Sequence, residues 1–304
     1  MKPCYLIVNP KAGGGRGALM ATRAEAHLQR AGVPCQRVDT QKPGDGERLA
    51  RALQPENFHR LIVVGGDGTI NEVVRGLKTP GIPLAVIPAG SGNDFARLLG
   101  IRGEEHALET ALHGIQRRID LGMSSFGSFV NIFSFGFDAA IATRANQWKN
   151  RLPAWLLYPA ALVMTLFSFK PLTMHITTES AQGLRKEVTG SYLLMAVCNG
   201  SHYGGGMQIN PQADPFDGRL ELCLIREMPG WKILFLFPTV YRGKHLRFSE
   251  VTIEKVVRVS FSSEAPGLVN QDGETWPERQ GEVWIQGKGL EVMSPVLIEN
   301  TERE

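Results

Sequence analysis

The first 120 residues alternate short apolar runs with longer stretches of helical periodicity. The apolar runs read YLIV, CQRV, LIVV and LAVI, and helical patterns follow them near residues 18–31, 46–53, 70 onward and 94 onward. Alternation of this kind predicts an α/β domain, a parallel sheet with helices on both faces.

Each apolar run in this region is followed by a loop rich in glycine. The four loops read NPKAGGGRG, DTQKPGDG, GGDGT and PAGSGND. Parallel strands send the loops that follow them to one edge of the sheet, where open α/β folds bind their ligands. The four loops therefore predict a single binding site.

The pattern changes near Phe126. From there the apolar runs are short, β-like and separated by turn residues, and helical patterns are limited to roughly Ala140 to Phe169 and Trp231 to Tyr241. This predicts a mainly antiparallel β-sandwich domain. We expect an α/β domain over residues 1–125, a β-rich domain over 126–290 and a C-terminal segment, 291–304, whose apolar run LEVMSPVLI fits either domain.

Composition limits the function classes. A chain of 304 residues is too long for one ordinary core, and its 43% hydrophobic share is typical of a globular protein. The formal net charge of +3 indicates no nucleic-acid arm. Four dispersed cysteines without a C-x-x-C pair, scattered histidines, and no signal-peptide pattern predict a cytoplasmic protein without a zinc site.

One uncharged segment, residues 152–169, is just long enough to be a candidate membrane span. Pro153 and Pro159 within it argue against a spanning helix, so we expect no transmembrane helix. A helix packed inside the second domain is favoured, and an apolar surface that touches a bilayer is the second interpretation. Basic residues flank the segment at Lys149, Arg151 and Lys170.

The stretch GGDGTINE has features of a phosphate site. Its glycines, Gly65, Gly66 and Gly68, can take positive φ and so turn backbone N–H groups inward. Thr69 and Glu72 have the spacing of a capping box, which would start a helix there and direct its positive end at the same point. Asp67 would repel phosphate unless Mg²⁺ lies between them. The alternative is a glycine-rich turn with a solvated aspartate.

A rival phosphate motif lies in the first loop. GGGRGA, Gly13 to Ala18, satisfies G-x-G-x-x-A after a strand, and Asp39 closes the next strand as in a dinucleotide-binding fingerprint. Alone it would suggest an oxidoreductase. Because Pro10 and Lys11 separate strand and glycines, and because the motif does not account for the loops near Gly65 and Gly90, it is disfavoured.

Five motifs together resemble the diacylglycerol kinase catalytic family, above all its bacterial soluble lipid kinases. They are NPKAGGG, GGDGTINEVVRG, IPAGSGNDFAR, DPFDGRLEL and QDGE, and they follow the family's order along nearly the whole chain. GGDGT is shared with NAD kinases and 6-phosphofructokinases, whereas the GNDFAR and DGE elements favour a lipid kinase. The resemblance implies a nucleotide-binding first domain and a lipid-binding second domain.

The resemblance assigns nucleotide contacts to all four loops. Ala12 and Ser91 depart from it, since the family usually has serine and threonine there, and the hydroxyl is lost only at Ala12. The implied residues are Asn9, Pro10, Lys11, Ala12 and Gly13 in the first loop, Thr40 in the second, Gly66, Asp67, Gly68, Thr69, Ile70, Asn71 and Glu72 in the third, and Ser91 in the fourth.

Metal ligands are implied at two places. Asp94 and Asp120 match acidic positions of a Mg²⁺-linked network with Asp67. In DPFDG, the resemblance implies a structural Mg²⁺ bound by the Asp217 carboxylate and by the carbonyls of Asp214 and Arg219. An ordinary β-turn explains the FDG sequence equally well.

The resemblance places the general base in NQDGETW. A lipid hydroxyl must lose its proton as phosphorus is attacked, and a carboxylate can take it. Asp272 is the first candidate and Glu274 the second, because one of the two can serve to orient the other. The family usually has an apolar residue where this chain has Gln271.

We therefore expect an ATP-dependent lipid kinase that uses Mg²⁺ and transfers the γ-phosphate to a hydroxyl of a membrane lipid such as diacylglycerol, phosphatidylglycerol or a sphingoid base. It would be cytoplasmic and peripheral at the inner membrane surface. The alternatives are an NAD or polyol kinase on the same nucleotide loop, or a non-catalytic lipid- or nucleotide-binding module. No sequence feature specifies the lipid or the oligomeric state.

Overall fold

The structure, a computed structural model, describes residues 2–77, 81–148 and 154–296. It divides into two compact units. The first takes the chain up to Ile119 together with the residues from Lys288 onward, and the second takes Asp120–Gly287. The sequence predicted domain boundaries at 125/126 and 290/291. In the structure both boundaries lie earlier in the chain, after Ile119 and before Lys288.

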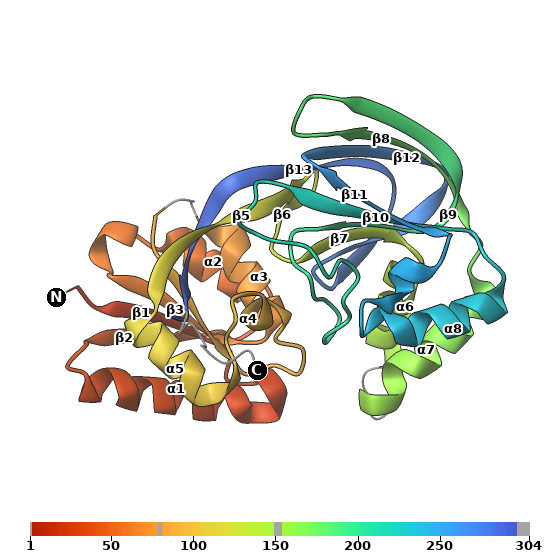
Figure 1. Ribbon diagram of the computed structural model, residues 1–304. Helices are drawn as coiled ribbons and strands as arrows, with labels where there is room; N and C mark the ends of the chain where they lie inside the picture. Colours follow the sequence, from red (N-terminus) through yellow and green to blue (C-terminus); the bar gives the residue numbers. More distant parts are fainter. Residues whose placement is uncertain (1, 78–80, 149–153, 297–304) are drawn as a thin grey trace, which may run out of the picture. The chain divides into compact units, whose positions relative to one another are not determined.

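The first unit is an α/β fold, as the sequence predicts (Figure 1). Four parallel strands lie in the order β2–β1–β3–β4, and Val292 of β13 pairs in parallel with Leu84 of β4. Its elements are β1 (Cys4–Val8), α1 (Ala12–Arg30), β2 (Cys35–Asp39), α2 (Asp45–Ala52), η1 (Pro55–Asn57), β3 (Arg60–Gly65), α3 (Asp67–Gly76), β4 (Leu84–Pro88), α4 (Asp94–Leu98) and α5 (Gly103–His113).

Burial explains which sequences form these strands. Every residue of β1, β3 and β4 is buried, so these strands are almost continuously apolar, whereas β2 at the edge is half-buried and reads CQRVD. Helices α1 and α5 pack on one face, and α2 and α3 pack against each other on the opposite face (Figure 1). The carboxyl ends of the parallel strands therefore carry the four glycine-rich loops on one edge.

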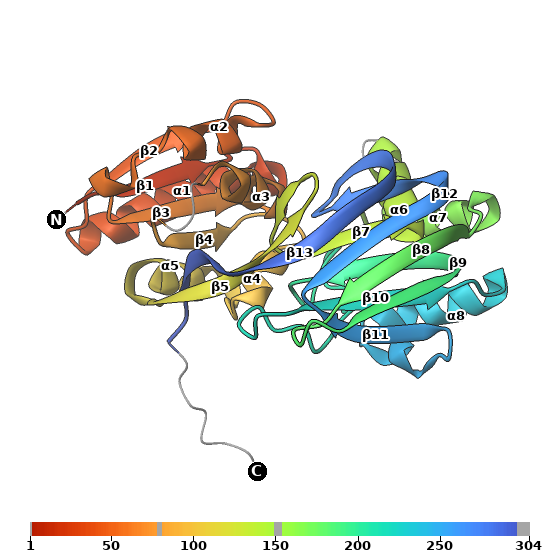
Figure 2. The ribbon, with the colours of Figure 1, turned by 90° about the horizontal axis from the view of Figure 1, so that it is seen from above.

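The second unit is mainly antiparallel, again as predicted (Figure 2). Strands β7 and β8 each pair with both β9 and β12, so these four strands close a ring. Strands β5 (Ile115–Ser124) and β13 (Glu274–Ser294) each run from one unit into the other. The remaining elements are β6 (Gly127–Phe129), β7 (Ile132–Gly136), α6 (Phe137–Trp148), α7 (Ala154–Ser168), β8 (Leu172–Glu179), β9 (Arg185–Cys198), β10 (Leu220–Arg226), α8 (Gly230–Val240), η2 (Lys244–Arg247), β11 (Val251–Val256) and β12 (Arg258–Gln271).

Strand β9 separates two hydrophobic cores in this unit. Leu194, Ala196 and Cys198 face a core shared with α6, α7 and α8, whereas the alternate residues Met195 and Val197 face a core between the strands. Side chains of a strand alternate between its two faces, so a strand covered on both faces must be apolar throughout. This accounts for the uninterrupted LLMAVC of the sequence.

Of the apolar segment at residues 152–169, Ala154–Ser168 form α7, a helix of 15 residues; the first two residues lie outside the described part of the chain, and Phe169 follows the helix. Within the described ranges no helix is long and apolar enough to cross a membrane. The favoured interpretation, a helix packed in the second domain, is supported by Ala161 and Leu162, which are buried in the core beneath the helices.

Phe135→Ala tests the core between the strands. The ring is fully buried and lies 4.9 Å from that of Phe261, so we expect a loss of about 3–5 kcal/mol in the free energy of unfolding. All five tryptophans lie in this unit, so their fluorescence during urea unfolding reports on it. Leu184→Ala, at a side chain 72% exposed, should change the value by less than about 0.5 kcal/mol. Equal losses in both variants would contradict the assigned core.

Candidate functional site

The loops after β1, β3 and β4 touch one another at the sheet edge. A Cβ on Gly90 would lie 2.7 Å from the Cα of Gly66, and a Cβ on Gly13 would overlap the carbonyl oxygen of Ala89. Such contacts leave no room for a side chain, so these positions require glycine. The side-chain amide of Asn9 also donates to Thr69 Oγ1 at 3.0 Å. Three of the four predicted loops therefore form one surface.

The loop after β2 joins this surface through Glu72. The Gly46 N–H donates to Glu72 Oε2 at 3.0 Å. The predicted capping box of Thr69 and Glu72 is wrong: α3 begins at Asp67, its cap is Gly66, and no side chain caps it. Because the helix starts three residues earlier than expected, Thr69 and Glu72 lie inside it and bind neighbouring segments, at Asn9 and Gly46, instead.

The glycines of the third loop are not in the expected conformation. Gly66 has φ −95° and ψ −179°, and Gly65, Gly66 and Gly68 are not among the glycines with positive φ. The run of positive φ lies instead at Gly13–Gly15, with values of 57°, 69° and 102°, so these residues near the start of α1 are not helical and belong to the first glycine-rich loop. Glycine is needed at Gly65 because a Cβ there would lie 2.8 Å from that of Thr69.

The first turn of α3 nevertheless retains the features of an anion site. Backbone N–H groups in the first turn of a helix have no partner within the helix, and the helix dipole adds positive potential there. A Cβ on Gly68 would meet nothing within 4 Å, so space is open beside this turn. The exposed Lys11 and Arg16 of the first loop supply cations on the same edge. Phosphate groups fit this environment.

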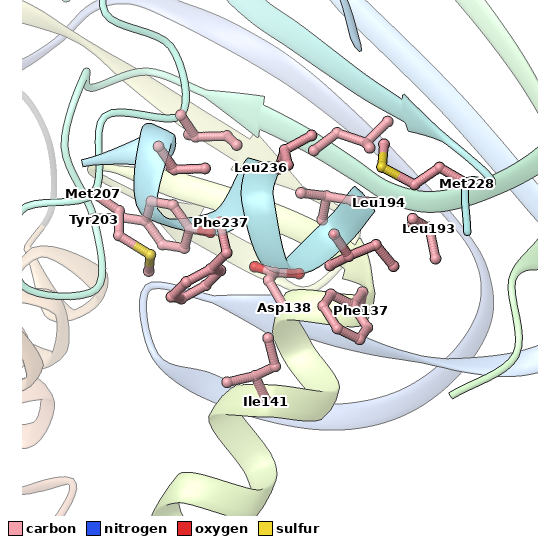
Figure 3. A pocket seen from close by; sticks show the side chains of 14 residues that line it. Phe137, Asp138, Ile141, Leu193, Leu194, Tyr203, Met207, Met228, Leu236 and Phe237 are labelled. Carbon is pink, nitrogen blue, oxygen red and sulfur yellow. The ribbon is translucent and has the colours of Figure 1, made fainter. Parts of the chain in front are cut away.

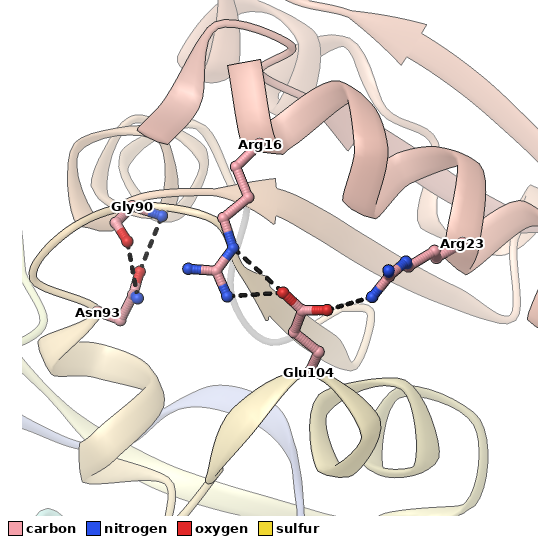
Figure 4. Close-up of polar contacts among 5 residues, drawn as sticks. All are labelled: Arg16, Arg23, Gly90, Asn93 and Glu104. Carbon is pink, nitrogen blue, oxygen red and sulfur yellow. Dashed lines mark hydrogen bonds and ion pairs between the residues drawn. The ribbon is translucent and has the colours of Figure 1, made fainter. Parts of the chain in front are cut away.

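Arg16 was not singled out from the sequence, and the structure shows how it is held (Figure 4). Its guanidinium donates to Glu104 Oε1 through Nε at 3.2 Å and through Nη2 at 2.7 Å, and Arg23 pairs with the other oxygen of Glu104. The partner that orients Arg16 is 88 residues away, so no local pattern identifies it.

In the fourth loop, the Asn93 side chain closes a turn on Gly90, accepting from its N–H at 3.0 Å and donating to its carbonyl at 2.9 Å.

Asp67 and Asp94 lie at adjoining helix starts. The Asp67 carboxylate accepts the Phe95 N–H at 3.1 Å, and Asp94, which is buried, pairs with Arg97 at 2.7 Å. Asp120 belongs to the second unit. Among the residues that the structure describes, no three His, Cys, Asp or Glu side chains gather in a group that could hold a metal. The Mg²⁺ network through these aspartates stays a prediction.

The other residues assigned to nucleotide binding differ in exposure. Ser91 is exposed, whereas Thr40 is 9% exposed and donates its N–H to the Val8 carbonyl at 2.8 Å. Ile70 and Asn71 are buried in α3, so any ligand contact of Ile70 would come from its backbone. The structure tests none of these contacts with a ligand. For the rival dinucleotide motif, the Asp39 carboxylate already accepts from Nε and Nη2 of Arg37, at 2.7 and 3.0 Å.

The DPFDG loop of the second unit is held by Asp120. The Asp120 carboxylate accepts the Gly218 N–H at 2.7 Å, and its own N–H donates to the Pro215 carbonyl at 2.7 Å. The Asp217 N–H donates to the Asp214 carbonyl at 3.3 Å, which gives the β-turn that was the alternative to a metal loop. Asp217 Oδ1 accepts the Arg219 N–H at 3.0 Å, and its Oδ2 lies 2.7 Å from Lys255 Nζ. Asp217 therefore forms an ion pair with Lys255, and the Mg²⁺ loop implied by the resemblance stays a prediction.

Asp272 and Glu274 lie at the tip of the hairpin between β12 and β13. Asp272 and Gly273 both have positive φ, 49° and 96°, as a two-residue hairpin turn requires. The Asp272 carboxylate accepts three backbone N–H groups, from Val130 at 2.7 Å, Asn131 at 3.1 Å and Ile132 at 2.9 Å. Glu274 begins β13 and is exposed. The two carboxylates are therefore distinguished by their surroundings.

The residues before Asp272 tie this turn to the body of the unit. Gln271, which departs from the family pattern, is buried, and its amide accepts from Ser124 Oγ at 2.7 Å and donates to the Ser128 carbonyl at 3.0 Å. Asn270 accepts the Gly273 N–H at 2.9 Å and donates to Asp138 Oδ2 at 3.3 Å. A polar residue at position 271 is thus accommodated because its hydrogen bonds are made.

Asp138, which accepts the hydrogen bond from Asn270, lines an apolar cavity of about 50 Å³ (Figure 3). The carboxyl of Asp138 points into the cavity among apolar side chains, and burial raises its pKa. Ser134 Oγ donates to it at 2.5 Å. Sequence reasoning did not select Asp138. The other residues that line the cavity come from α6, β9, the loop before β10, β10 with the loop after it, and α8, and include Phe137, Ile141, Leu194, Met207, Leu236 and Phe237.

Comparisons with known proteins cover both units. Residues 3–124 match the family model described as diacylglycerol kinase catalytic domain, and residues 131–294 match the model described as YegS C-terminal NAD kinase beta sandwich-like domain. The chain is 32% identical over 287 residues to "Probable lipid kinase YegS-like" of Chromohalobacter salexigens, which covers 90% of this chain and 89% of that protein. It is 29% identical over 299 residues to "Diacylglycerol kinase" of Mycobacterium tuberculosis, with 95% and 94% covered.

Among solved structures, a diacylglycerol kinase from Bacillus anthracis str. Sterne has a TM-score of 0.74 at 20% identity, covering 96% of this chain and 97% of that one. At this identity the match shows a shared fold. The family models and the relatives show more, because they span both units at up to 32% identity. The chain therefore belongs to the family of diacylglycerol kinases and YegS-like lipid kinases, which are phosphotransferases acting on an alcohol acceptor.

Proposed function

We propose that this protein is an ATP-dependent kinase that transfers the γ-phosphate to a hydroxyl of a membrane lipid at the inner face of the membrane. The observation that carries the proposal is the hairpin tip of the second unit. There one carboxylate, Asp272, is committed to three backbone N–H groups, and a second, Glu274, is exposed two residues away. We infer that Asp272 fixes the turn and that Glu274 acts on the substrate.

The loops of the first unit are suited to hold the nucleotide. ATP supplies the phosphoryl group, and Mg²⁺ offsets the negative charge of the phosphates. The first turn of α3 offers N–H groups to the phosphates, and Gly68 leaves space for them. Lys11 and Arg16 add positive charge, and Asp67 is the candidate metal ligand. Positioning and charge neutralisation provide most of the catalysis in such reactions.

The hairpin tip supports Glu274 as the general base, which reverses the order expected from the sequence. A substrate hydroxyl would have to compete with three N–H donors for the oxygens of Asp272. Glu274 takes the hydroxyl proton while the hydroxyl oxygen bonds to phosphorus and the bond to the departing ADP oxygen breaks. Asp272 holds residues 130–132 and so positions the turn.

The apolar cavity supports a lipid acceptor over a soluble alcohol. Its lining is apolar apart from Asp138, and Asp138 is connected through Asn270 to the turn that carries Glu274. An apolar cavity that binds benzene has a volume of about 150 Å³. The cavity of about 50 Å³ therefore admits an acyl chain only when the helices over it move.

Phosphate transfer from γ-labelled ATP to a panel of acceptors tests the function. The panel holds diacylglycerol, phosphatidylglycerol, a sphingoid base and NAD, and we expect labelled product from at least one lipid and none from NAD. Asp67→Ala should abolish transfer while the circular dichroism spectrum is unchanged, which excludes a contaminating kinase. Transfer to NAD alone would establish the rival kinase, and ATP binding without turnover on any acceptor would establish a non-catalytic module.

Glu274→Gln and Asp272→Asn separate the two carboxylates. We expect Glu274→Gln to lower kcat by about 10²- to 10⁴-fold and to leave the protein folded, because glutamine keeps the shape of the side chain but cannot take up the hydroxyl proton. Asn tolerates positive φ as Asp does, but its NH₂ group cannot accept backbone N–H groups. Asp272→Asn should therefore cost about 2 kcal/mol or more of stability. A Glu274→Gln enzyme with near-normal kcat would return the role of base to Asp272.

A further inference from the structure

Helix α8 has an exposed apolar face. Trp231, Leu234 and Phe235 are 65%, 44% and 69% exposed, and their spacing of i, i+3 and i+4 places them on one side of the helix. The rings of Trp231 and Phe235 lie edge to face, 6.4 Å apart. Large aromatic side chains together on an exposed surface mark an interaction site.

The opposite face of the same helix is apolar as well. Ile233, Leu236 and Val240 are buried and line the cavity that contains Asp138 (Figure 3). A helix that is apolar all round is normally buried on every side. Helix α7, which packs beside α8, also exposes Val163 and Met164, at 43% and 53%. Something must therefore cover this part of the second unit.

The charges that follow α8 indicate what covers it. Arg242, Lys244 and Arg247 come directly after the helix, around the short turn η2, and all three are exposed. The acidic Glu250 nearby is paired with Lys232 at 2.5 Å. Exposed aromatic and leucine side chains with adjacent basic residues are typical of helices that lie in the interface of an anionic bilayer.

We propose that the exposed face of α8, with the basic residues after it, is the surface that docks this protein on an anionic lipid bilayer. The proposal rests on the lipid kinase function, because it places the membrane against the helix that covers the apolar cavity. Sequence patterns pointed to residues 152–169 for this role. The structure makes α8 the main contact and leaves α7 as its neighbour.

Vesicle flotation tests the docking surface. We expect the protein to float with phosphatidylcholine vesicles that contain phosphatidylglycerol, and less with pure phosphatidylcholine or at high salt. Trp231→Ser combined with Phe235→Ser should weaken binding to the anionic vesicles by roughly tenfold or more. The matched control is Leu19→Ser combined with Leu184→Ser, at side chains 52% and 72% exposed elsewhere, and it should bind as the wild type does.

Transfer to a short-chain, water-soluble acceptor separates docking from catalysis. The α8 variant should retain transfer to this acceptor and lose transfer to vesicles. If it floats as well as the wild type does, docking by α8 is wrong even when the kinase is active. If no acceptor is phosphorylated but flotation depends on α8, the kinase proposal fails and docking stands. A dimer in sedimentation that Trp231→Ser dissociates, without vesicle binding, would assign the face to a second copy instead.

A different observation carries a second inference, at the DPFDG loop. Lys255 Nζ lies 2.7 Å from Asp217 Oδ2 and 3.6 Å from Glu221 Oε1. Lys255 and Glu221 are direct neighbours across β11 and β10, so the strand register places this cation between a loop carboxylate and a strand carboxylate. Among the described residues no donor lies within hydrogen-bond distance of the Glu221 carboxylate, which is 1% exposed.

These contacts resemble those of a cation site that is already filled. Lys255 is the cation that lies beside both carboxylates, 2.7 Å from Asp217 and 3.6 Å from Glu221. A divalent ion bound to Asp217 would have to share one carboxylate with the ammonium group, and two cations on one carboxylate repel each other. We infer that Lys255 is the built-in cation of this loop, in the place that the family resemblance gives to Mg²⁺.

Metal analysis of the nucleotide-free protein tests this inference. We expect the wild type to carry no stoichiometric metal by mass spectrometry, and its Tm to be the same in EDTA and in Mg²⁺. Lys255→Met should lower the Tm in EDTA and gain stability from Mg²⁺, because Asp217 then lacks a cation. Lys186→Met removes a surface lysine that pairs with Glu254 at 3.1 Å and should gain no stability from Mg²⁺.

Metal bound to the wild type but not to Asp217→Asn would overturn the inference, as would a wild-type Tm that falls in EDTA. These two measurements do not depend on whether Lys255→Met folds. Because nucleotide is absent throughout, metal that accompanies ATP cannot contribute to the result.

Discussion

The contact between the backbones of Gly66 and Gly90 is the constraint on which the first unit depends. A single Cβ at either residue would lie within 3.2 Å of the other's Cα, so the third and fourth loops can meet only as glycine against glycine. Gly13 brings the first loop against Ala89 in the same way. Close backbone packing replaces the positive φ angles expected for the third loop. It leaves the N–H groups of the first turn of α3 beside open space, which is where an anion is best stabilised.

In the second unit, strand β9 contributes residues to two hydrophobic cores. Because β9 is covered on both faces, its alternate residues stabilise a core between the strands and a second core under the helices. The cavity lies in the second core, and α8 both lines that cavity and exposes its other face. Apolar surface on both sides of a helix is unfavourable in water unless something covers it. In the proposed function both partners of this helix are lipid, one on the side of the cavity and one at its exposed face.

The acidic residues of the motifs differ in whether their carboxylates accept hydrogen bonds from backbone N–H groups. Asp120 and Asp272 each bind N–H groups of a distant loop and hold it in place. Glu274 is at the exposed end of the same hairpin as Asp272 and is suited to proton transfer. Asp217 is neutralised by Lys255. Acidic residues that look alike in a motif therefore differ in their contacts, because their partners come from other parts of the chain.

The sequence by itself determined the alternation of strands and helices, the parallel and antiparallel parts, the four loops on one edge and the family, because these depend on periodicity and on motifs within a few residues. Tertiary structure alone decided that Thr69 and Glu72 bind other loops rather than cap α3, that Gln271 is satisfied by Ser124 and Ser128, and that Asp138 lines a cavity. It also placed Lys255 beside Asp217 and left Trp231 and Phe235 exposed. These features join residues far apart in the chain, and a contact between distant segments has no local pattern that could predict it.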